Sequence, residues 1–370
     1  MTGNARQVEA VLTVDLDAVV SNWRLLAEMA GRAECAAVVK ADAYGLGAVH
    51  VSAALEAAGC RTYFVAHSRE GFELRRTLRR NSRVFVLNGA PAGMERELAE
   101  AALTPVVNTL GDLAVWRSCA AATGKRLAVA LQLDSGMARL GLAPEDVEMI
   151  AADEGLLHGL SVELVMSHLA CADEEGHPAN EAQRSTFERL RARLPDAPAS
   201  LANSSGTFLG KGFHFDVLRP GAALYGINPT PWTSNPMRQT VGLRARIIQT
   251  RKVKAGTAVG YGHRAVVDRD TTLATISLGY ADGWPRNAGA AAFHRGQPVP
   301  FLGRVSMDSI VLDMTGCTTM PREGDFVDLL CPGQNVDDIA CAAGTIGYEI
   351  LSRLGRRFHR NYVGPGGTGQ

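Results

Sequence analysis

The chain has 370 residues, 46% of them hydrophobic, and its 38 Lys and Arg balance its 38 Asp and Glu. This composition is typical of a folded globular protein, and the absence of a basic stripe argues against nucleic acid binding. Seven scattered cysteines form no CxxC pair, which argues against a disulfide framework and against a metal site. At the N-terminus, residues 1–14 lack a signal-peptide pattern, and no apolar run reaches the ~18 residues that span a membrane, so we expect a cytoplasmic protein without membrane partners.

Residues 34–226 alternate short apolar runs with helical patterns. Eight runs separated by helices predict an α/β fold with a (β/α)8 TIM-type barrel. The eighth run is weak, so an open doubly wound sheet is the alternative. The runs are 35–41, 62–67, 83–88, 103–108, 127–134, 162–168, 199–203 and 217–219.

From about residue 243 the pattern changes to short alternating segments between turns, which is typical of antiparallel sheet. We therefore predict a barrel domain over residues 1–240 and a mainly β C-terminal domain over residues 241–370. A strand-like segment at 11–16 precedes the barrel, and the sequence leaves open whether it pairs with the second domain.

Polar residues follow several of the predicted strands, at the rim where barrel enzymes place their chemistry. Lys40 ends the first run, where an amine suits Schiff-base chemistry or, with equal weight, simply reaches solvent. Arg139 follows the fifth run, His168 ends the sixth, and Arg219 ends the eighth. Each has an ordinary structural explanation, but together they favour a site.

The segments Asn203–Gly206 and Gly221–Ala222 have the small residues of an anion-binding turn. A helix N-cap would explain the first equally well. A lysine opposite a phosphate site fits pyridoxal 5′-phosphate, which carries an aldehyde and a phosphate.

Nine segments together resemble the alanine racemases, a family of fold-type III pyridoxal-phosphate enzymes. They are VVKADAYG, LDSGMARLGL, MSHLACAD, ANSSGTF, RPGAALYG, VGYG, LGYADG, GRVSMD and IGYEIL, in family order between residues 14 and 363. The resemblance implies a barrel, a C-terminal β domain, and a head-to-tail homodimer in which each site combines one barrel with the partner's C-terminal domain.

The resemblance also implies a role for individual residues. Lys40 and Tyr261 would be the two catalytic bases, with Tyr261 reaching in from the other subunit. Arg219 would face the pyridine nitrogen, with His168 hydrogen-bonded behind it, and this pair would supply the positive charge that lets a tyrosine act as a base. The other implied contacts are Tyr44, Ser204, Gly221, Ala222 and Tyr348 for the phosphate, Arg139 and Met307 for the substrate carboxylate, and Asp173, Tyr280, Arg286 and Arg304 for the entry corridor.

Racemisation explains these residue types, because inverting Cα needs one base on each face. An arginine at the ring nitrogen rarely gives up its proton, which weakens the ring as an electron sink and limits side reactions. The expected activity is interconversion of L-alanine and D-alanine, supplying D-alanine for peptidoglycan.

Gln132 departs from the family pattern, in which many relatives have a carboxylated lysine beside the arginine that corresponds to Arg139. Either the Gln132 amide or a bound anion such as chloride must then accompany Arg139. The alternatives for the function are a racemase of broader specificity, although Asp42 and Tyr348 favour a small side chain, and a non-catalytic pyridoxal-phosphate carrier. A fold-related decarboxylase is disfavoured because it would need an acidic residue in place of Arg219.

Overall fold

The computed structural model describes residues 8–364, so the first half of the segment examined for a signal peptide lies outside the described residues. The described residues fall into two compact units. Val19–Arg238 forms one, and the described parts of Met1–Ala18 and Gln239–Gln370 form the other. Within residues 8–364 no helix has the length and apolar character needed to cross a bilayer.

Residues 19–238, all of which are described, contain a closed barrel of parallel strands. The strands β3 to β9 pair in parallel in chain order. The ring closes because β10 pairs in parallel with β2, which continues into β3 after Ala36. On the other side of β10, the Arg219 N–H donates to the Ala202 carbonyl at 3.0 Å. The predicted eight-stranded barrel is confirmed, and the open sheet is wrong.

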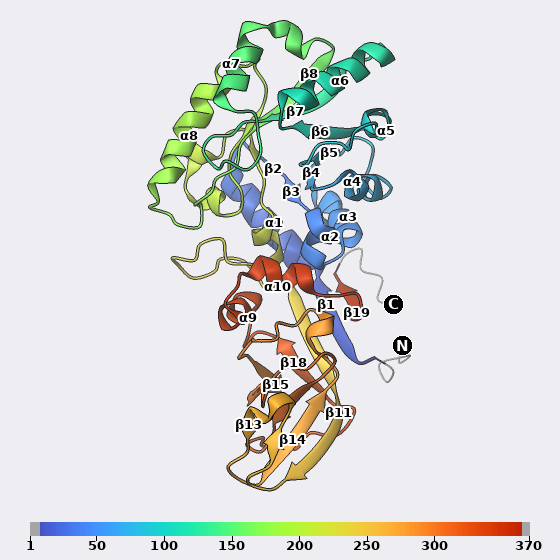
Figure 1. The fold of residues 1–370 in the computed structure, drawn as a ribbon, viewed down its shortest axis with the longest axis vertical. Helices are drawn as coiled ribbons and strands as arrows, with labels where there is room; N and C mark the ends of the chain where they lie inside the picture. Colours follow the sequence, from blue (N-terminus) through green and yellow to red (C-terminus); the bar gives the residue numbers. More distant parts are fainter. Residues whose placement is uncertain (1–7, 365–370) are drawn as a thin grey trace. The chain divides into compact units, whose positions relative to one another are not determined.

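Helices α4 to α8 lie outside the strands of the barrel (Figure 1). Its strands are β2 (Glu34–Cys35), β3 (Ala37–Val38), β4 (Thr62–Val65), β5 (Arg83–Val86), β6 (Leu103–Val107), β7 (Leu127–Gln132), β8 (Leu160–Met166), β9 (Ala199–Ser200) and β10 (Val217–Leu218). The helices are α1 (Leu16–Ala30), which starts in the other unit, α2 (Lys40–Gly45), α3 (Ala48–Ala58), α4 (Ser68–Arg75), α5 (Glu95–Glu100), α6 (Leu110–Thr123), α7 (Pro144–Ala152) and α8 (Pro178–Arg191).

Local sequence explains where these helices begin and end. Before α6, the Thr109 hydroxyl accepts the Asp112 N–H at 3.0 Å, and the Asp112 carboxylate accepts the Thr109 N–H at 3.1 Å. This reciprocal pair satisfies N–H groups that a helix start otherwise leaves free. Gly124, with φ of 64°, ends the helix in a left-handed conformation that glycine adopts without strain.

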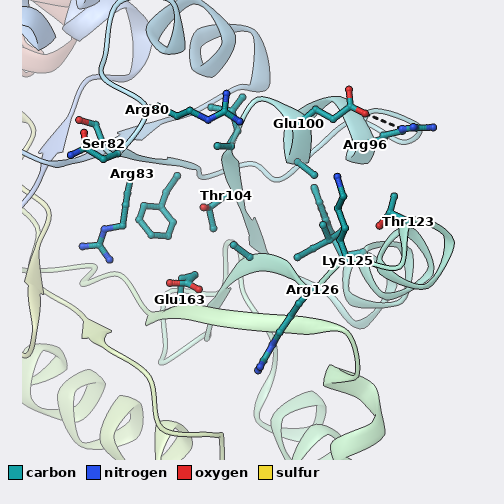
Figure 2. A pocket seen from close by; sticks show the side chains of 18 of the residues that line it. Arg80, Ser82, Arg83, Arg96, Glu100, Thr104, Thr123, Lys125, Arg126 and Glu163 are labelled. Atoms are coloured by element: carbon teal, nitrogen blue, oxygen red, sulfur yellow. Dashed lines mark hydrogen bonds and ion pairs between the residues drawn. The ribbon is translucent and has the colours of Figure 1, made fainter.

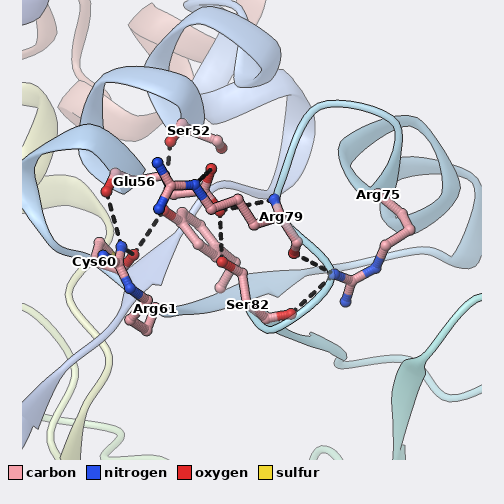
Figure 3. Close-up of polar contacts among 8 residues, drawn as sticks. Ser52, Glu56, Cys60, Arg61, Arg75, Arg79 and Ser82 are labelled. Atoms are coloured by element: carbon pink, nitrogen blue, oxygen red, sulfur yellow. Dashed lines mark hydrogen bonds and ion pairs between the residues drawn. The ribbon is translucent and has the colours of Figure 1, made fainter.

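A polar network fixes the face of the barrel where the strands begin (Figure 3). The Glu56 carboxylate accepts the Ser82 hydroxyl at 2.5 Å and the Arg79 N–H at 2.9 Å. The Arg75 guanidinium donates to the Ser82 carbonyl and to the Ala102 carbonyl, both at 2.9 Å. The loop before β5 is thereby tied to α3, to α4 and to the residue before β6.

The other unit is built on the long strand β11 (Val241–Val253). The first half of β11 pairs antiparallel with β1 (Ala10–Asp15) and β18 (Phe326–Leu330), and its second half pairs with β14 (Thr271–Ile276). The sequence did not decide to which domain the strand-like segment 11–16 belongs. In the structure, β1 covers most of it and is a strand of this sheet. The remaining elements are β12 (Ala258–Val259), β13 (Ala265–Val266), β15 (Ala291–His294), β16 (Gln297–Pro300), β17 (Ile310–Asp313), β19 (His359–Val363), α9 (Val336–Ala343) and α10 (Gly347–Arg353).

Candidate active site

Lys40 follows β3 at the carboxyl end of the first barrel strand and opens an unusual turn. The next four residues, from Ala41 to Tyr44, have φ between 53° and 56° and ψ between 38° and 52°. This is the left-handed helical region, which disfavours L-residues by ~1–2 kcal/mol each. Only strong tertiary contacts can hold four such residues together.

Two carboxylates hold this turn. Glu70 of α4 accepts the Ala41 N–H at 2.7 Å, and its other oxygen accepts the N–H groups of Ala66 and His67 at 2.7 and 3.1 Å. Asp42 accepts the Ala48 N–H at 2.7 Å. Glu70 therefore connects the turn after β3 to the end of β4, which fixes the backbone of Lys40.

The electrostatic surroundings of Lys40 favour a neutral amine. Burial lowers its pKa from 10.5, and the charges of Arg139 and Arg219 lower it further, while Glu70 acts in the opposite direction. The structure thus brings Lys40, Arg139 and Arg219 into one region, as the positions at the strand ends predicted. A neutral amine is the form that attacks an aldehyde.

Arg219 is buried at the end of β10 and is held by the backbone and a hydroxyl. Its guanidinium donates to the Ser200 hydroxyl and, at 2.5 Å, to the Ser167 carbonyl, and it lies 5.9 Å from the centre of the Phe64 ring. Burial lowers its pKa to about 9, so it remains charged near neutral pH. The side chain is fixed, but its hold on the proton is weaker than for an exposed arginine.

His168 differs from the expectation in its hydrogen bonding. Among the described residues no hydrogen bond joins it to Arg219, whose donors go to Ser200 and Ser167 instead. Burial, followed by the charges of Arg219, Arg139 and Lys40, lowers the pKa of His168 to about 3. The imidazole is therefore neutral near pH 7, and the positive charge of the His168–Arg219 pair is that of the Arg219 guanidinium.

The predicted phosphate-binding residues of the barrel lie together. The Ser204 hydroxyl accepts the N–H groups of Gly221 and Ala223 at 3.0 and 3.1 Å, and Ala222 begins the short 3-10 helix Ala222–Tyr225. A Cβ added at Gly221 would stand 2.5 Å from the Tyr44 hydroxyl oxygen, so any side chain there would have to displace Tyr44. Tyr44, Ser204 and Gly221 thus form one small, mostly buried cradle.

Arg139 lies in a loop after β7 whose backbone is held by Asp134. The Asp134 carboxylate accepts the N–H groups of Gly136, Met137 and Ala138 at 2.9, 2.9 and 3.1 Å, and these bonds lower its pKa despite its burial. Arg139 is exposed, and within residues 8–364 its side chain has neither a hydrogen bond nor an ion pair. Gln132 is buried at the end of β7, and no hydrogen bond joins it to Arg139 in this part of the chain.

The remaining candidates lie in the other unit, apart from Asp173, which is exposed after β8. Main-chain bonds connect the Tyr280 and Met307 turns: Tyr280 N–H donates to Ser306 O at 3.1 Å, and Ala281 N–H donates to Met307 O at 2.9 Å. Arg286 lies 5.9 Å from the centre of the Tyr280 ring. Large side chains here are unusually exposed, with Tyr261 at 69% and Met307 at 53%, followed by Tyr280 and Tyr348. Arg304 is exposed as well.

Two residues that position the site are absent from the prediction. The role of Glu70 at the start of α4 could have been found, because it stands three residues after His67, which is the spacing of a capping box, but its bond to Ala41 could not. Gln183 of α8 offered no such signal: its side chain donates to the His168 carbonyl at 2.9 Å and accepts the Ala170 N–H at 2.8 Å. Residues 8–364 contain no group of His, Cys, Asp and Glu suited to a metal ion.

Comparison with known proteins agrees with this geometry. The family model of the alanine racemase N-terminal domain matches residues 14–229, and that of the C-terminal domain matches residues 240–362. The chain is 55% identical over 356 residues, 96% of this chain and 93% of the relative, to the catabolic alanine racemase of Mesorhizobium japonicum. It is 46% identical to the alanine racemase of Rhodospirillum rubrum over the full length of both chains.

A solved structure extends the agreement to three dimensions. The alanine racemase of Bartonella henselae, solved with covalently bound pyridoxal phosphate, is 38% identical and has a TM-score of 0.93, with 96% of this chain and 99% of that chain covered. The match of both family models over most of the sequence leaves one conclusion: the chain belongs to the alanine racemase family.

Proposed function

We propose that this chain is a pyridoxal-phosphate-dependent racemase that interconverts L-alanine and D-alanine. The observation that supports the proposal best is the position of Lys40. Its pKa is lowered and its backbone is fixed. Tyr44, Ser204 and Gly221 form a cradle in the same barrel. The cradle fits a phosphate group. A Cβ at Gly221 would collide with Tyr44, so the backbone there is bare, and the hydroxyl groups of Tyr44 and Ser204 lie beside it. A neutral amine at the same rim fits an aldehyde.

Each residue of the barrel site has a task in this reaction. When bound, the cofactor withdraws electrons from the substrate's Cα and so makes its proton removable. Lys40 would take or give that proton on the D face, and Arg139 would hold the substrate carboxylate. Arg219, held by Ser200 and Ser167, would lie at the ring nitrogen without protonating it.

The second base of the proposal is Tyr261, contributed by a second copy of the chain in a head-to-tail homodimer. Tyr261 and Met307 are large side chains left more than half exposed, in a unit where Tyr280 and Tyr348 are also exposed. Exposed aromatic and methionine side chains in one unit are typical of a surface that meets a partner. In the dimer, Tyr261 would work on the L face, while Met307 and Tyr348 would contact the substrate and the phosphate.

The physiological direction needs separate evidence, because two enantiomers have equal free energies and the enzyme favours neither. Supply of D-alanine for peptidoglycan is one role. Consumption of alanine is the other, which the names of two relatives support, the Mesorhizobium japonicum racemase and the 48% identical catabolic racemase of Agrobacterium fabrum. A gene deletion that requires D-alanine for growth would support supply. A deletion that grows without D-alanine but loses growth on alanine as the carbon source would support consumption.

Purified protein tests the reaction itself. It should convert L-alanine to D-alanine and the reverse with equal kcat/KM, because the two enantiomers have equal free energies, and borohydride reduction should attach the cofactor to the peptide that contains Lys40. Serine and lysine in the same assay separate an alanine racemase from one of broader range. A protein that binds the cofactor and racemises none of these amino acids would be a carrier, and the proposal would be wrong.

A further inference from the structure

A large cavity opens at the face of the barrel where the strands begin, opposite the strand ends that carry Lys40, His168 and Arg219. Its volume is about 600 Å³, within the range of small-molecule sites. Protein interiors are otherwise packed so closely that few voids exceed a water molecule. Residues from the loops before β5 and β7, from α5 and α6, and from strands β5 to β8 line it (Figure 2).

The cavity exists because β6 and β7 separate at their beginnings. The two strands pair only at Val106–Ala130 and Val107–Leu131, whereas β6 pairs with β5 from Leu103 onward and β7 pairs with β8 from Leu127 onward. Pro105, which has no N–H to add to a ladder, stands where the pairing stops. The separation leaves Ala128 exposed in a strand whose other residues are buried.

The cavity has apolar as well as charged walls. Its base is formed by Phe85, Trp116, Leu103 and Leu127, but at 1–6% exposure these side chains are covered by their neighbours, and Phe85 stacks on Phe64 beneath the Arg83 guanidinium. The apolar surface that a ligand can reach comes from Ala99, Ala122 and Ala128, which are half-buried or exposed. This surface suits the organic part of a small molecule.

The rim carries more positive charge than the protein neutralises. Five cations line the cavity against two carboxylates: Arg80, Arg83, Arg96, Lys125 and Arg126 against Glu100 and Glu163. Arg83 pairs with Glu34, and Arg96 pairs with Glu100 at 3.0 Å. In the described part of the chain, the side chains of Arg80 and Lys125 have no hydrogen bond or ion pair. Figure 2 shows these two on different sides of the hollow.

The walls are fixed before any ligand arrives. The guanidinium of Arg75 connects two lining residues through its bonds to the carbonyls of Ser82 and Ala102. The Ser82 hydroxyl is held in turn by Glu56 (Figure 3). A preformed cavity loses less conformational entropy on binding than one that must be ordered.

We propose that this cavity binds a small organic anion, whose carboxylate or phosphate is attracted by the charges of Arg80 and Lys125 and whose organic body fills the space lined by Ala99, Ala122 and Ala128. A free inorganic anion would leave most of the volume unused. A neutral apolar molecule would leave the two cations without partners. The site is separate from the racemisation site and does not depend on the proposed function.

Calorimetric titration of the holoenzyme, freed of unbound cofactor, tests the site. Phenyl phosphate and benzoate are the probes. Inorganic phosphate carries the charge without the ring, and benzyl alcohol carries the ring without the charge. Racemic alanine at saturation occupies the Arg139 site without net conversion, so binding that persists in its presence is remote from Arg139. We expect at least one aromatic anion to bind about tenfold or more tightly than either half-probe.

Two variants locate the binding. Arg80→Glu with Lys125→Glu should weaken binding of the aromatic anion about tenfold or more, because two attracting charges are replaced by two repelling ones. Arg189→Glu with Lys211→Glu, which makes the same charge change at exposed positions outside the cavity, should leave binding unchanged. Ala128→Phe fills the cavity without altering charge and should also abolish binding, while far-ultraviolet circular dichroism verifies the fold of each variant.

Three results would overturn the proposal. One is no saturable binding of either aromatic anion to the wild-type protein. Another is binding that survives the Arg80 and Lys125 double change or falls equally in its matched control. The third is inorganic phosphate binding as tightly as phenyl phosphate, which would show that the cavity contributes nothing beyond its charges.

Discussion

Lys40 concentrates the chemistry of the barrel site in one amine, and its pKa decides how readily it reacts. Because burial and the charges of Arg139 and Arg219 lower this pKa from 10.5, the neutral amine should persist to lower pH than in a free lysine. The rate at which apoprotein captures pyridoxal phosphate, followed by visible absorbance, should therefore rise with pH and level off below pH 10.5. Arg139→Met removes one of the lowering charges and should move the midpoint upward; an unmoved midpoint would contradict this account.

The lowered pKa of His168 predicts how the free energy of unfolding depends on pH. Its folded pKa of about 3 lies below the ordinary value of 6.5, so between these pH values the unfolded chain binds the proton and the folded chain does not. The free energy of unfolding then falls as pH is lowered through this window, with a slope of up to about 1.4 kcal/mol per pH unit from this residue. Denaturant unfolding of the apoprotein at several pH values should show a shallower slope for His168→Gln. Equal slopes would mean that the imidazole is already protonated in the folded protein.

The surroundings of Gln132 and Arg139 predict that KM for alanine depends on a bound anion. Arg139 is exposed, has no protein partner in residues 8–364, and receives no hydrogen bond from the buried Gln132, so we expect a bound halide to orient it for the substrate carboxylate. Exhaustive removal of chloride should raise KM for alanine, and chloride added at constant ionic strength should restore it. If the amide suffices, Gln132→Ala will raise KM and chloride will change nothing. Stimulation by bicarbonate would show a carboxylated side chain after all and refute both readings.

The left-handed turn after Lys40 is the element with the greatest backbone strain in the barrel site. Ala41 is exposed and has φ of 53°, where glycine carries no steric penalty. Ala41→Gly should therefore raise the free energy of unfolding by up to about 1 kcal/mol, or leave it unchanged if the freed chain entropy cancels the gain. Ala53→Gly, at an exposed position within the right-handed helix α3, should lower it by about 0.5–1 kcal/mol. Loss of stability at both positions would show that the turn is not strained.

That turn also marks the limit of what the sequence predicts for an element. Hydrophobic periodicity identified every barrel strand, because each is an apolar run of the right length between helical patterns. The run at 35–41, however, ends as a strand at Val38, since Glu70 and Asp42 draw the next residues into a left-handed turn. Contacts made across 29 residues of sequence leave no local pattern. In the other unit, Gly344 ends α9 in a left-handed conformation, so α10 is a separate helix.

At the scale of the whole molecule, the resemblance supplied what local patterns could not. Motif order pointed to residues that the fold brings together, such as Tyr44, Ser204 and Gly221, although they lie far apart in sequence. It also implied a hydrogen bond between His168 and Arg219, which is absent among the described residues because the Arg219 guanidinium donates to Ser200 and Ser167. The cavity at the opposite face had no sequence signal, since it arises from the separation of two strands around Pro105.

If two copies of the chain share their active sites, mixing two inactive variants should restore activity. Lys40→Ala and Tyr261→Phe should each inactivate the enzyme, because each removes one of the two bases. If every site takes Lys40 from one chain and Tyr261 from the other, a mixed dimer has one site with both defects and one site with neither. Random exchange then restores about a quarter of wild-type activity, since half of the dimers are mixed and half of their sites are intact.

Subunit exchange must be shown independently, by capture of one affinity-tagged variant with its untagged partner. A mixture of Lys40→Ala with Lys40→Arg is the matched control, because every site then lacks the amine whichever chains combine. If each site is built from a single chain, mixed dimers contain one defect in every site and stay inactive. Proven exchange without recovered activity would therefore place Tyr261 on the same chain as the Lys40 it serves, or outside the reaction.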